Sequence, residues 1–401
     1  MHILILEAGL TGHHANYLEH IASTFLAQGH KLTISVREEH AANPLFSRLQ
    51  ARHPGRVDAK AIPPLPSWTR VFARLGVVGS ELSYWLMFKR FFQQLCVKDR
   101  VDHVFFPYLD YCLHATALLG SLCDQVLWSG ICMRPSFHYS GTGVIAPKPK
   151  WRDIKERLFY RLLRQPSLHK LLTIDELLEQ YARQKQPLCA QKLAFVPDPA
   201  ELTNHYDRTS ARHILNIPEQ DYVILVYGAI DCRKGIEYLL AATRENAFPR
   251  NLTILVAGKQ TLVFKDKLLR EQKVISVDQY VDSATEEAVF RASDAVWLGY
   301  RSHYSMSGVL MLAAVAAKPV LATRNGLIGW LTRTYDLGIS IDCEKTLEVE
   351  RAVHALMEGQ KFSVPNSGMQ TIQARHSWAE FDKIILRALP SSCLPLPKHT
   401  N

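Results

Sequence analysis

A short cationic loop lies between an apolar strand and a helix in the second half of the chain. The apolar segment 222–227 ends at Gly228, and Arg233 and Lys234 directly precede an amphipathic helix. Glycine lets a ligand come close to the backbone, and the free N–H groups at a helix start attract anions. Two cations there would offset the charge that grows on a phosphate leaving group. The pattern favours a diphosphate site, and the alternative is a solvated surface pair.

A second loop of the same kind precedes the small-residue helix that follows residue 308. Backbone N–H groups of Ser307, Gly308 and Val309 would point toward an anion at the start of this helix. Ser307 could instead cap the helix with its side chain, and a capped end can still present N–H groups. Two strand–loop–helix units in one half of the chain therefore indicate a nucleoside-diphosphate pocket.

The segment 222–342 resembles the donor half of GT-B glycosyltransferases, in particular the GT4-like "glycosyl transferases group 1" family. In that family a strand ends in Gly and a Lys-Gly pair follows, as Gly228 and residues 234–235 do here. A later small-residue helix ends in Gly-Lys-Pro-Val, and this sequence has Lys-Pro-Val at 318–320 with Ala317 before it.

The sequence departs from the family at two acidic positions. The paired glutamates of the family signature fall at Tyr304 and Leu312. The second of them commonly binds the ribose hydroxyls in the family, and leucine has no hydrogen-bonding group. The resemblance therefore implies poor discrimination between ribose and 2′-deoxyribose nucleotides. Glu286 and Glu287 lie in another segment and are interpreted as first-turn charges of a helix.

The resemblance also implies a fold and further ligand contacts. It predicts an α/β GT-B architecture, with two Rossmann-like domains whose parallel sheets face a central cleft and a C-terminal helix that crosses back to the first domain. The loop with Gly9, Gly12 and His13 would face the cleft, unless it is only a tight turn with an exposed histidine. The backbone of Tyr280 and Val281 would line the base pocket.

The alternation of apolar strands and helices agrees with this architecture. Continuous apolar runs are typical of parallel strands that are covered by helices on both faces. The rigid sequence Pro-Asp-Pro at 197–199 marks a linker. We therefore predict an acceptor-side domain, a linker, a nucleotide-sugar-binding domain, a crossover helix and a tail at residues 1–196, 197–210, 211–370, 371–390 and 391–401.

Three polar residues of the first half are candidates for proton transfer. Asp110 follows the apolar strand at 103–106, and Arg134 and His138 follow the next one. Loops at the carboxyl ends of parallel strands face the ligand crevice in α/β proteins. A general base needs a carboxylate or an imidazole within reach of the acceptor hydroxyl, so Asp110 is our first choice and His138 our second.

The composition indicates an anionic partner and no metal. The chain has 47 Lys and Arg residues against 38 Asp and Glu residues, which gives a net charge of +9. No nucleic-acid-binding motif is present, so nucleic acid is the weakest candidate partner. The eight cysteines show no CxxC pair or zinc spacing and are interpreted as buried thiols in a reducing cytosol.

The sequence predicts a cytoplasmic protein that lacks a membrane-spanning segment. No apolar run reaches the roughly 18 residues that a spanning helix needs, and the N-terminus reads as a first strand rather than a signal peptide. Residues 66–98 and 151–170 combine aromatic and basic side chains, which is typical of peripheral contact with an anionic membrane surface. The alternative is that both stretches are ordinary helices covering the first sheet.

The sequence thus favours a glycosyltransferase that moves a sugar from a UDP- or GDP-linked donor to a hydroxyl of a glycan or lipid-linked acceptor. Such an enzyme would serve polysaccharide or glycolipid biosynthesis, with retention or inversion left open. The resemblance implies that no metal or other cofactor is needed. Two alternatives remain, a catalytically silent GT-B-like partner or sensor subunit and a sugar-nucleotide epimerase.

Overall fold

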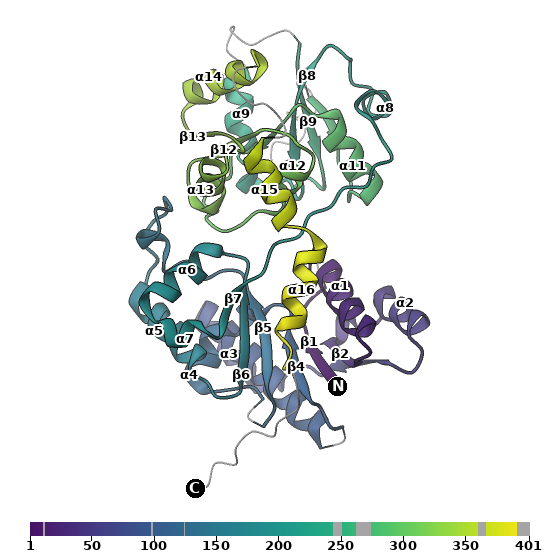
Figure 1. Ribbon diagram of the computed structural model, residues 1–401, viewed down its shortest axis with the longest axis vertical. Coiled ribbons are helices and arrows are strands. Elements are labelled where there is room, and N and C mark those ends of the chain that lie inside the picture. Colours follow the sequence, from purple (N-terminus) through teal and green to yellow (C-terminus); the bar gives the residue numbers. More distant parts are fainter. Residues whose placement is uncertain are drawn as a thin grey trace. The chain divides into compact units, whose positions relative to one another are not determined.

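The computed structural model describes residues 1–10, 13–97, 99–123, 125–243, 251–261, 274–359 and 366–390. They form two compact units, each built on its own parallel sheet (Figure 1). Unit 1 comprises Met1–His138, Lys148–Val196 and Ala379–Asn401, and unit 2 comprises Tyr139–Pro147 and Pro197–Trp378. The chain therefore changes unit four times. The predicted tail at 391–401 lies outside the described residues.

Unit 1 contains a seven-stranded sheet in the order β3-β2-β1-β4-β5-β6-β7, and every pair of neighbours is parallel. Its strands are β1 (His2–Leu6), β2 (Lys31–Arg37), β3 (Val57–Ile62), β4 (His103–Phe106), β5 (Trp128–Cys132), β6 (Leu168–Thr173) and β7 (Leu193–Phe195). Its helices are α1 (His13–Ala27), α2 (Pro44–Arg52), α3 (Gly76–Cys96), α4 (Leu113–Leu119), α5 (Arg152–Leu163), α6 (Glu176–Lys185), α7 (Pro187–Ala190) and α16 (Trp378–Arg387).

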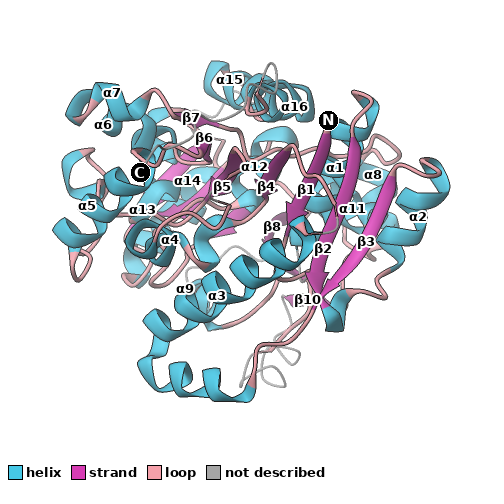
Figure 2. Cartoon of the chain, turned by 90° about the horizontal axis from the view of Figure 1, so that it is seen from below, coloured by secondary structure: helices cyan, strands magenta, loops and turns pink. Residues whose placement is uncertain are grey.

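Helices cover both faces of the unit 1 sheet (Figure 2). Successive strand residues point to opposite faces, so Phe106 packs on Phe88 of α3 while Phe105 packs on Phe25 of α1. Burial on both sides explains why the strands are apolar without alternation.

The C-terminal helix α16 packs on unit 1, beside α1 (Figure 1). Phe381 is fully buried there, and the His20 ring nitrogen Nε2 lies 2.7 Å from Oδ1 of Asp382. Beyond the helix, the Ser129 hydroxyl of β5 donates to the carbonyl of Ala388 at 2.6 Å. The predicted return of the last helix to the first sheet is confirmed.

Unit 2 contains a six-stranded parallel sheet in the order β10-β9-β8-β11-β12-β13. Its strands are β8 (Tyr222–Tyr227), β9 (Leu252–Ala257), β10 (Val274–Val277), β11 (Ala295–Leu298), β12 (Val320–Thr323) and β13 (Gly338–Ile341). Its helices are α8 (Arg208–Ile214), α9 (Ile236–Thr243), α11 (Ser283–Ala292), α12 (Gly308–Val315), α13 (Gly326–Thr334), α14 (Thr346–Met357) and α15 (Ser367–Arg375). The two parallel sheets predicted from the sequence are confirmed.

Separate apolar clusters cover the two faces of the unit 2 sheet. On one face Leu225 of β8 packs with Phe290 of α11 and Leu310 of α12. On the other face Ile224 packs with Leu239 of α9 and Val353 of α14. The small residues of α12 thus belong to a helix that is buried against the sheet, with its N-terminus at the carboxyl edge of the strands.

Arg212 of α8 fixes this helix to the body of unit 2. Its side chain is fully buried, and one guanidinium nitrogen donates to Oδ2 of Asp294 at 2.7 Å. The other nitrogens donate to four carbonyl groups, those of Ala292, Pro218, Glu219 and Asp221.

Glu287 holds the segment that leads into unit 2. Its buried carboxylate accepts hydrogen bonds from the Thr203 hydroxyl and from the backbone N–H groups of His205 and Tyr206. The interpretation of Glu287 as a first-turn helix charge missed this contact, which joins residues more than eighty positions apart in the chain.

We expect Glu287 to make unit 2 sensitive to acid. Burial acts to raise the pKa of Glu287, but the hydrogen bonds from Thr203, Tyr206 and His205 outweigh it and lower the pKa to about 2. The depressed pKa means that the stabilisation is present above the unfolded-state value of 4.5 and is lost as the pH falls toward 2. Urea unfolding of Glu287→Gln should show lower stability and a smaller loss between about pH 5 and about pH 3 than the wild type. An unchanged pH profile would contradict this role.

The structure buries most of the aromatic residues in the two stretches that could contact a membrane. Phe88, Phe91 and Phe92 of α3 and Phe159 of α5 lie in the unit 1 core. Ordinary helices covering the sheet thus account for these side chains. Among the helices of the described residues, none is long and apolar enough to cross a membrane.

Candidate functional site

The loop after β8 is shaped by two glycines in the left-handed region. Gly228 has φ of 101°, and a Cβ there would lie 3.2 Å from Nζ of Lys234. Gly235 has φ of 59°, and a Cβ there would lie 2.1 Å from the carbonyl oxygen of Gly299. Glycine is therefore required at both positions. Gly228 leaves room for the Lys234 side chain, and Gly235 leaves room for the backbone after β11.

Lys234 is a buried cation that has no carboxylate partner among the described residues. Its side chain is 8% exposed, and within the described residues no carboxylate oxygen lies within 4.0 Å of Nζ. Nζ donates to the Tyr300 hydroxyl at 2.5 Å and lies 4.4 Å from the centroid of that ring. A buried ammonium is costly unless a counter-charge is present, so this position is suited to an anionic ligand.

The start of α12 lies beside Lys234. The Ser307 hydroxyl lies 3.2 Å from the Tyr300 hydroxyl and does not cap the helix, so the predicted side-chain cap is absent. Cγ2 of Val309 lies 4.0 Å from the position of a Cβ on Gly228. Gly308 begins the helix, and a Cβ on it would lie 3.7 Å from Oδ2 of Asp198. The structure therefore brings Gly228, Lys234, Ser307, Gly308 and Val309 together.

Tyr300 is the residue of this cluster that sequence reasoning missed. It lies two residues after β11 and links Lys234 to Ser307 through one hydroxyl group. The available signal was its place at the carboxyl end of an apolar strand, where ligand-binding loops begin.

Arg233 is held differently from Lys234. Its guanidinium group pairs with the Asp231 carboxylate at 2.8 Å and is 62% exposed. Burial lowers the pKa of His303 nearby, and the charges of Arg233 and Lys234 lower it further, so this imidazole is neutral at pH 7. Arg233 therefore lies at the exposed edge of the site.

Tyr280 and Val281 lie in the loop between β10 and α11. The Tyr280 side chain is 78% exposed, and its phenol contributes to raising the pKa of Tyr227, the last residue of β8, after burial and Glu286. No direct contact with Lys234 is present among the described residues.

Asp110 and Arg134 are in contact in unit 1, but the Asp110 carboxylate binds the backbone of Arg134 and not its guanidinium group. The Asp110 carboxylate accepts from the N–H groups of Met133 and Arg134 at 2.7 and 2.9 Å. Burial raises the pKa of Asp110 to about 6, and these two hydrogen bonds oppose the rise. The Arg134 guanidinium lies over the Tyr108 ring at 5.3 Å. Asp110 thus fixes the loop after β5.

His138 lies in the interior of unit 1. It is fully buried, and its Nε2 lies 2.8 Å from the Asp175 carboxylate, which also caps α6. An imidazole that no solvent reaches is poorly placed to take a proton from an acceptor, so the structure favours a structural role for it.

The loop after β1 contains an acidic residue that sequence reasoning did not single out. Glu7 is buried and accepts from the N–H of Gly9 at 3.1 Å, while Nδ1 of His14 lies 3.7 Å from the same carboxylate. A Cβ on Gly9 would lie 3.3 Å from the Tyr111 hydroxyl. Gly12 and the side chain of His13 lie outside the described residues.

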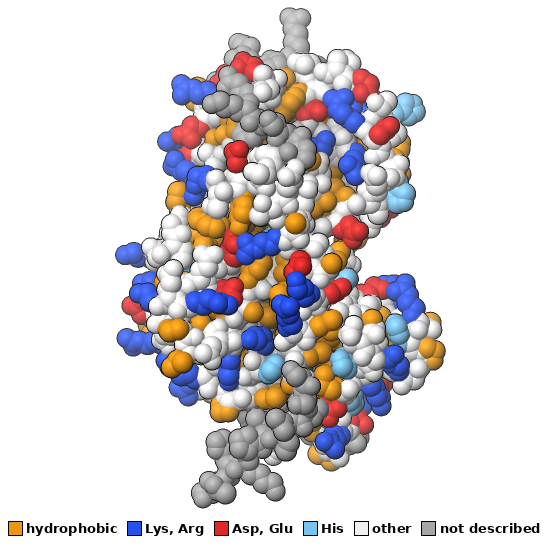
Figure 3. Space-filling model, viewed as in Figure 1, with side chains coloured by type: hydrophobic (Ala, Val, Ile, Leu, Met, Phe, Trp, Pro, Cys, Tyr) orange, Lys and Arg blue, Asp and Glu red, His pale blue; other side chains and the backbone are white. Residues whose placement is uncertain are grey.

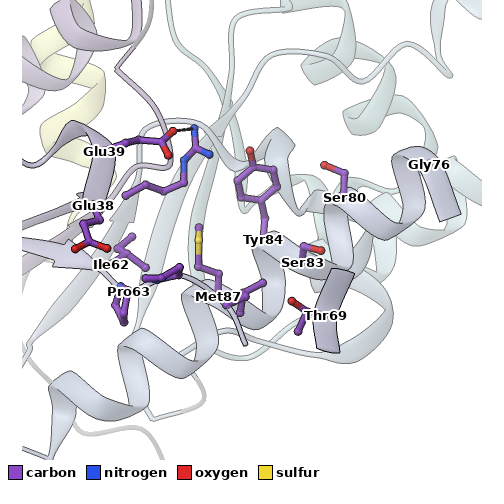
Figure 4. A pocket seen from close by; sticks show the side chains of 13 residues that line it. Glu38, Glu39, Ile62, Pro63, Thr69, Gly76, Ser80, Ser83, Tyr84 and Met87 are labelled. Carbon is purple, nitrogen blue, oxygen red and sulfur yellow. Dashed lines mark ion pairs between the residues drawn. The ribbon is translucent and has the colours of Figure 1, made fainter. Parts of the chain in front are cut away.

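Unit 1 also contains a groove with a volume of 740 Å³ between the carboxyl ends of β2 and β3 and helix α3. Figure 4 shows Met87 of α3 next to the segment at Ile62 and Pro63, with the ring of Tyr84 extending into the groove beside it. An Arg37–Glu39 ion pair of 2.8 Å lies at one end. Hydroxyl groups and apolar carbons share this groove, as an amphipathic or sugar-like ligand requires.

Comparison with known proteins identifies the fold. No family model matches the sequence, and no curated protein matches it. Solved structures match over nearly the whole chain, among them sucrose-phosphate synthase from Thermosynechococcus elongatus, with a TM-score of 0.66, 15% identity, and coverage of 96% of this chain and 97% of that one. The chain has the GT-B fold.

Two further GT-B structures are similar. HepE of Anabaena in complex with UDP has a TM-score of 0.64 and 14% identity, with 96% of this chain and 98% of that one covered. WaaG, a glycosyltransferase involved in lipopolysaccharide biosynthesis, has a TM-score of 0.59 and 14% identity, with 97% and 96% covered. At these sequence identities the structural similarity establishes the fold but does not establish the ligands.

The described residues offer no metal centre. No group of three or more His, Cys, Asp and Glu side chains that could hold a metal ion occurs among them.

Proposed function

We propose that this protein is a glycosyltransferase that uses a nucleoside-diphosphate sugar. The observation that carries the proposal is Lys234, a buried ammonium group that has no carboxylate within 4.0 Å in the described part of unit 2. A diphosphate would supply the missing negative charge. HepE, which has the same fold, has been solved with UDP and with UDP-glucose.

Lys234 and the start of α12 would act on the leaving group. As the bond to the sugar breaks, negative charge grows on the distal phosphate, and a fixed cation and helix N–H groups stabilise it without rearrangement. Tyr300 would keep Nζ in place, since its hydroxyl and ring both contact that group. Arg233, which is more exposed, would contribute charge at the entrance.

We propose that the acceptor binds in the groove of unit 1. Ser80, Ser83 and Tyr84 offer hydroxyl groups to a glycan. Val77 and Val78, on the first turn of α3 beside Gly76 of the groove, are 78% and 65% exposed and would suit an attached lipid. The geometry thus favours an amphipathic, lipid-linked acceptor over a small polar one.

A thermal-shift panel tests the nucleotide. UDP, GDP, ADP and CMP should be compared, and one nucleoside diphosphate at 100 times its dissociation constant should raise the free energy of unfolding by about 2.7 kcal/mol. Stabilisation by none of the diphosphates would contradict the proposal. Hydrolysis of the matching nucleotide sugar by the purified protein would then separate an enzyme from a silent sensor of the same fold.

We expect the protein to bind anionic membranes through α5. Trp151, which directly precedes α5, is 72% exposed, and Ile154 within the helix is 46% exposed. Arg157 and Arg161, three and seven residues after Ile154, are exposed as well, so these three residues of α5 lie at helical spacing. Figure 3 shows Lys and Arg side chains over the part of unit 1 where Figure 1 places α5, α6 and α7. An exposed tryptophan among basic residues is typical of a helix that lies in a membrane interface.

Vesicle sedimentation checks this expectation. Wild-type protein should bind vesicles with anionic lipid at low salt and dissociate as salt is added, because the attraction is screened. Replacing Arg157, Arg161 and Arg164 by Gln should weaken binding, and neutral vesicles are the control. A wild type that ignores anionic vesicles would show that these residues only cover the sheet.

A further inference from the structure

A tyrosine and a glutamate form a close pair at the carboxyl end of β8. The Tyr227 hydroxyl donates to Oε2 of Glu286, in the first turn of α11, at 2.5 Å. Both side chains are half-buried. Burial raises the pKa of Tyr227 and of Glu286, so the protein holds two polar groups together where water alone would solvate them better.

The fold does not account for Glu286 as it does for its neighbour. Glu287 accepts hydrogen bonds from the Thr203 hydroxyl and from the backbone N–H groups of His205 and Tyr206, and these fix the segment at 203–206. Within the described residues the Glu286 carboxylate accepts only from Tyr227, and Oε1 has no donor. The free oxygen is not enclosed, since it is not among the buried polar atoms that lack a partner. Glu286 is thus a half-buried carboxylate with one oxygen left to accept.

The pair lies directly beside the phosphate site. Tyr227 immediately precedes Gly228, and a Cβ on Gly228 would lie 3.2 Å from Nζ of Lys234. Burial and Glu286 are the main causes that raise the pKa of Tyr227, and the phenol of Tyr280, in the loop after β10, adds to them. The carboxyl edge of the sheet therefore presents an exposed aromatic ring, a carboxylate and a buried cation, in the loop after β10, the first turn of α11 and the loop after β8.

These three groups match the three parts of a nucleotide. A ring stacks on a base, a carboxylate accepts hydrogen bonds from a vicinal diol, and a cation holds phosphate; acidic residues bind ribose hydroxyls in the same way at other parallel sheets. Leu312 and Val309 of α12 have no side-chain group that could accept a hydrogen bond. We infer that Glu286, oriented by Tyr227, binds the ribose hydroxyls of the nucleotide, an assignment that rests on the proposed function.

Leu312 alone predicts poor discrimination between ribose and 2′-deoxyribose nucleotides, whereas ribose binding by Glu286 predicts clear discrimination. A site without an acceptor tolerates a missing hydroxyl, whereas a carboxylate left without its donor disfavours the analogue. The wild type should therefore bind a ribose diphosphate about 10- to 100-fold more tightly than its 2′-deoxy form. This preference depends on the free carboxylate oxygen of Glu286 and should be lost when a substitution removes that oxygen.

Calorimetric titration of a graded series tests the assignment. UDP, GDP, ADP and CDP are each compared with the 2′-deoxy form in the wild type, Glu286→Gln and Glu286→Met. The Met variant has the length of glutamate but no acceptor and should bind both forms within about threefold. The Gln variant keeps one acceptor and should lie between. Tyr227→Phe, which preserves packing on Phe290, should lose part of the preference.

The matched control is Glu358→Met, which removes an exposed carboxylate at the end of α14. It should leave the preference unchanged. If the wild type binds a diphosphate and Glu286→Met keeps the full ribose preference, the assignment is wrong while the proposed function stands. If the wild type binds no diphosphate at all, both fail. Loss of the preference in Glu286→Met with the control unaffected supports the assignment.

Discussion

Lys234→Met should lose most of the affinity for a nucleoside diphosphate and should not lose stability. A hydrogen bond to a charged group contributes about 1.5–3 kcal/mol, so the dissociation constant should rise about 10- to 150-fold. In the free protein the same change removes a buried ammonium group that no carboxylate neutralises in the described residues. Its removal should therefore leave the free energy of unfolding unchanged or raise it.

Titration calorimetry and urea unfolding of the same variant measure the two effects. Lys259→Met is the matched control, because Lys259 follows β9 in the same unit and is 67% exposed. It should change neither quantity appreciably. A variant at position 234 that binds as the wild type does would sink the phosphate assignment. A variant that loses both binding and stability would show instead that Lys234 supports the fold.

Arg212→Met should destabilise unit 2 by about 3 kcal/mol, the lower end of the range for breaking a buried ion pair. The arginine is fully buried, and its loss removes a donor from four carbonyl groups, of which that of Pro218 keeps the N–H of Asp221. Asp294 would keep the N–H of Val223 at 2.8 Å, so its charge is partly compensated. The midpoint of urea unfolding, followed by circular dichroism, measures the change.

Arg208 provides a matched control for this experiment. It contacts the same Asp294 carboxylate at 3.3 Å but is 45% exposed. Surface ion pairs contribute at most about 1 kcal/mol, so Arg208→Met should cost far less than Arg212→Met. Equal losses in the two variants would mean that burial of Arg212 does not decide its effect.

The strands and the phosphate loop could be predicted because their signals are local. A continuous apolar run predicts a strand covered on both faces, and both sheets are built from such runs. Gly228 and Gly235 stand where the backbone has positive φ, and glycine is the residue that tolerates it. The loop pattern together with the family resemblance favours Lys234 as a phosphate ligand.

The partners of these residues could not be predicted, because they come from distant parts of the chain. Tyr300 meets Lys234 across 66 positions, and Glu287 holds residues more than eighty positions away. His138 looked like a candidate base from its place after a strand, yet only the structure shows that Asp175 and full burial enclose it. A residue that directly follows a strand can be placed at the edge of the sheet, but its position does not predict whether its side chain is exposed.

Amphipathic patterns were ambiguous for a related reason. Aromatic residues at helical spacing have the same pattern whether the apolar face meets a lipid or a sheet. In α3 the face with Phe88, Phe91 and Phe92 meets the sheet, while Val77 and Val78 at its start stay exposed. Periodicity indicates that a face is apolar, and only packing shows what covers it.

The four changes of unit along the chain have a consequence for biosynthesis. Unit 1 includes residues from 379 onward, and unit 2 includes Tyr139–Pro147, whose Ile145 carbonyl accepts from the N–H of Gly326. Domains usually fold one after another as the ribosome makes them. In this protein α16, whose Phe381 is fully buried, belongs to unit 1 but is synthesised only after unit 2. Unit 1 therefore stays incomplete until unit 2 has been translated. Cutting the gene at residue 196 would therefore yield two incomplete halves, whereas coexpressing them could restore the pair.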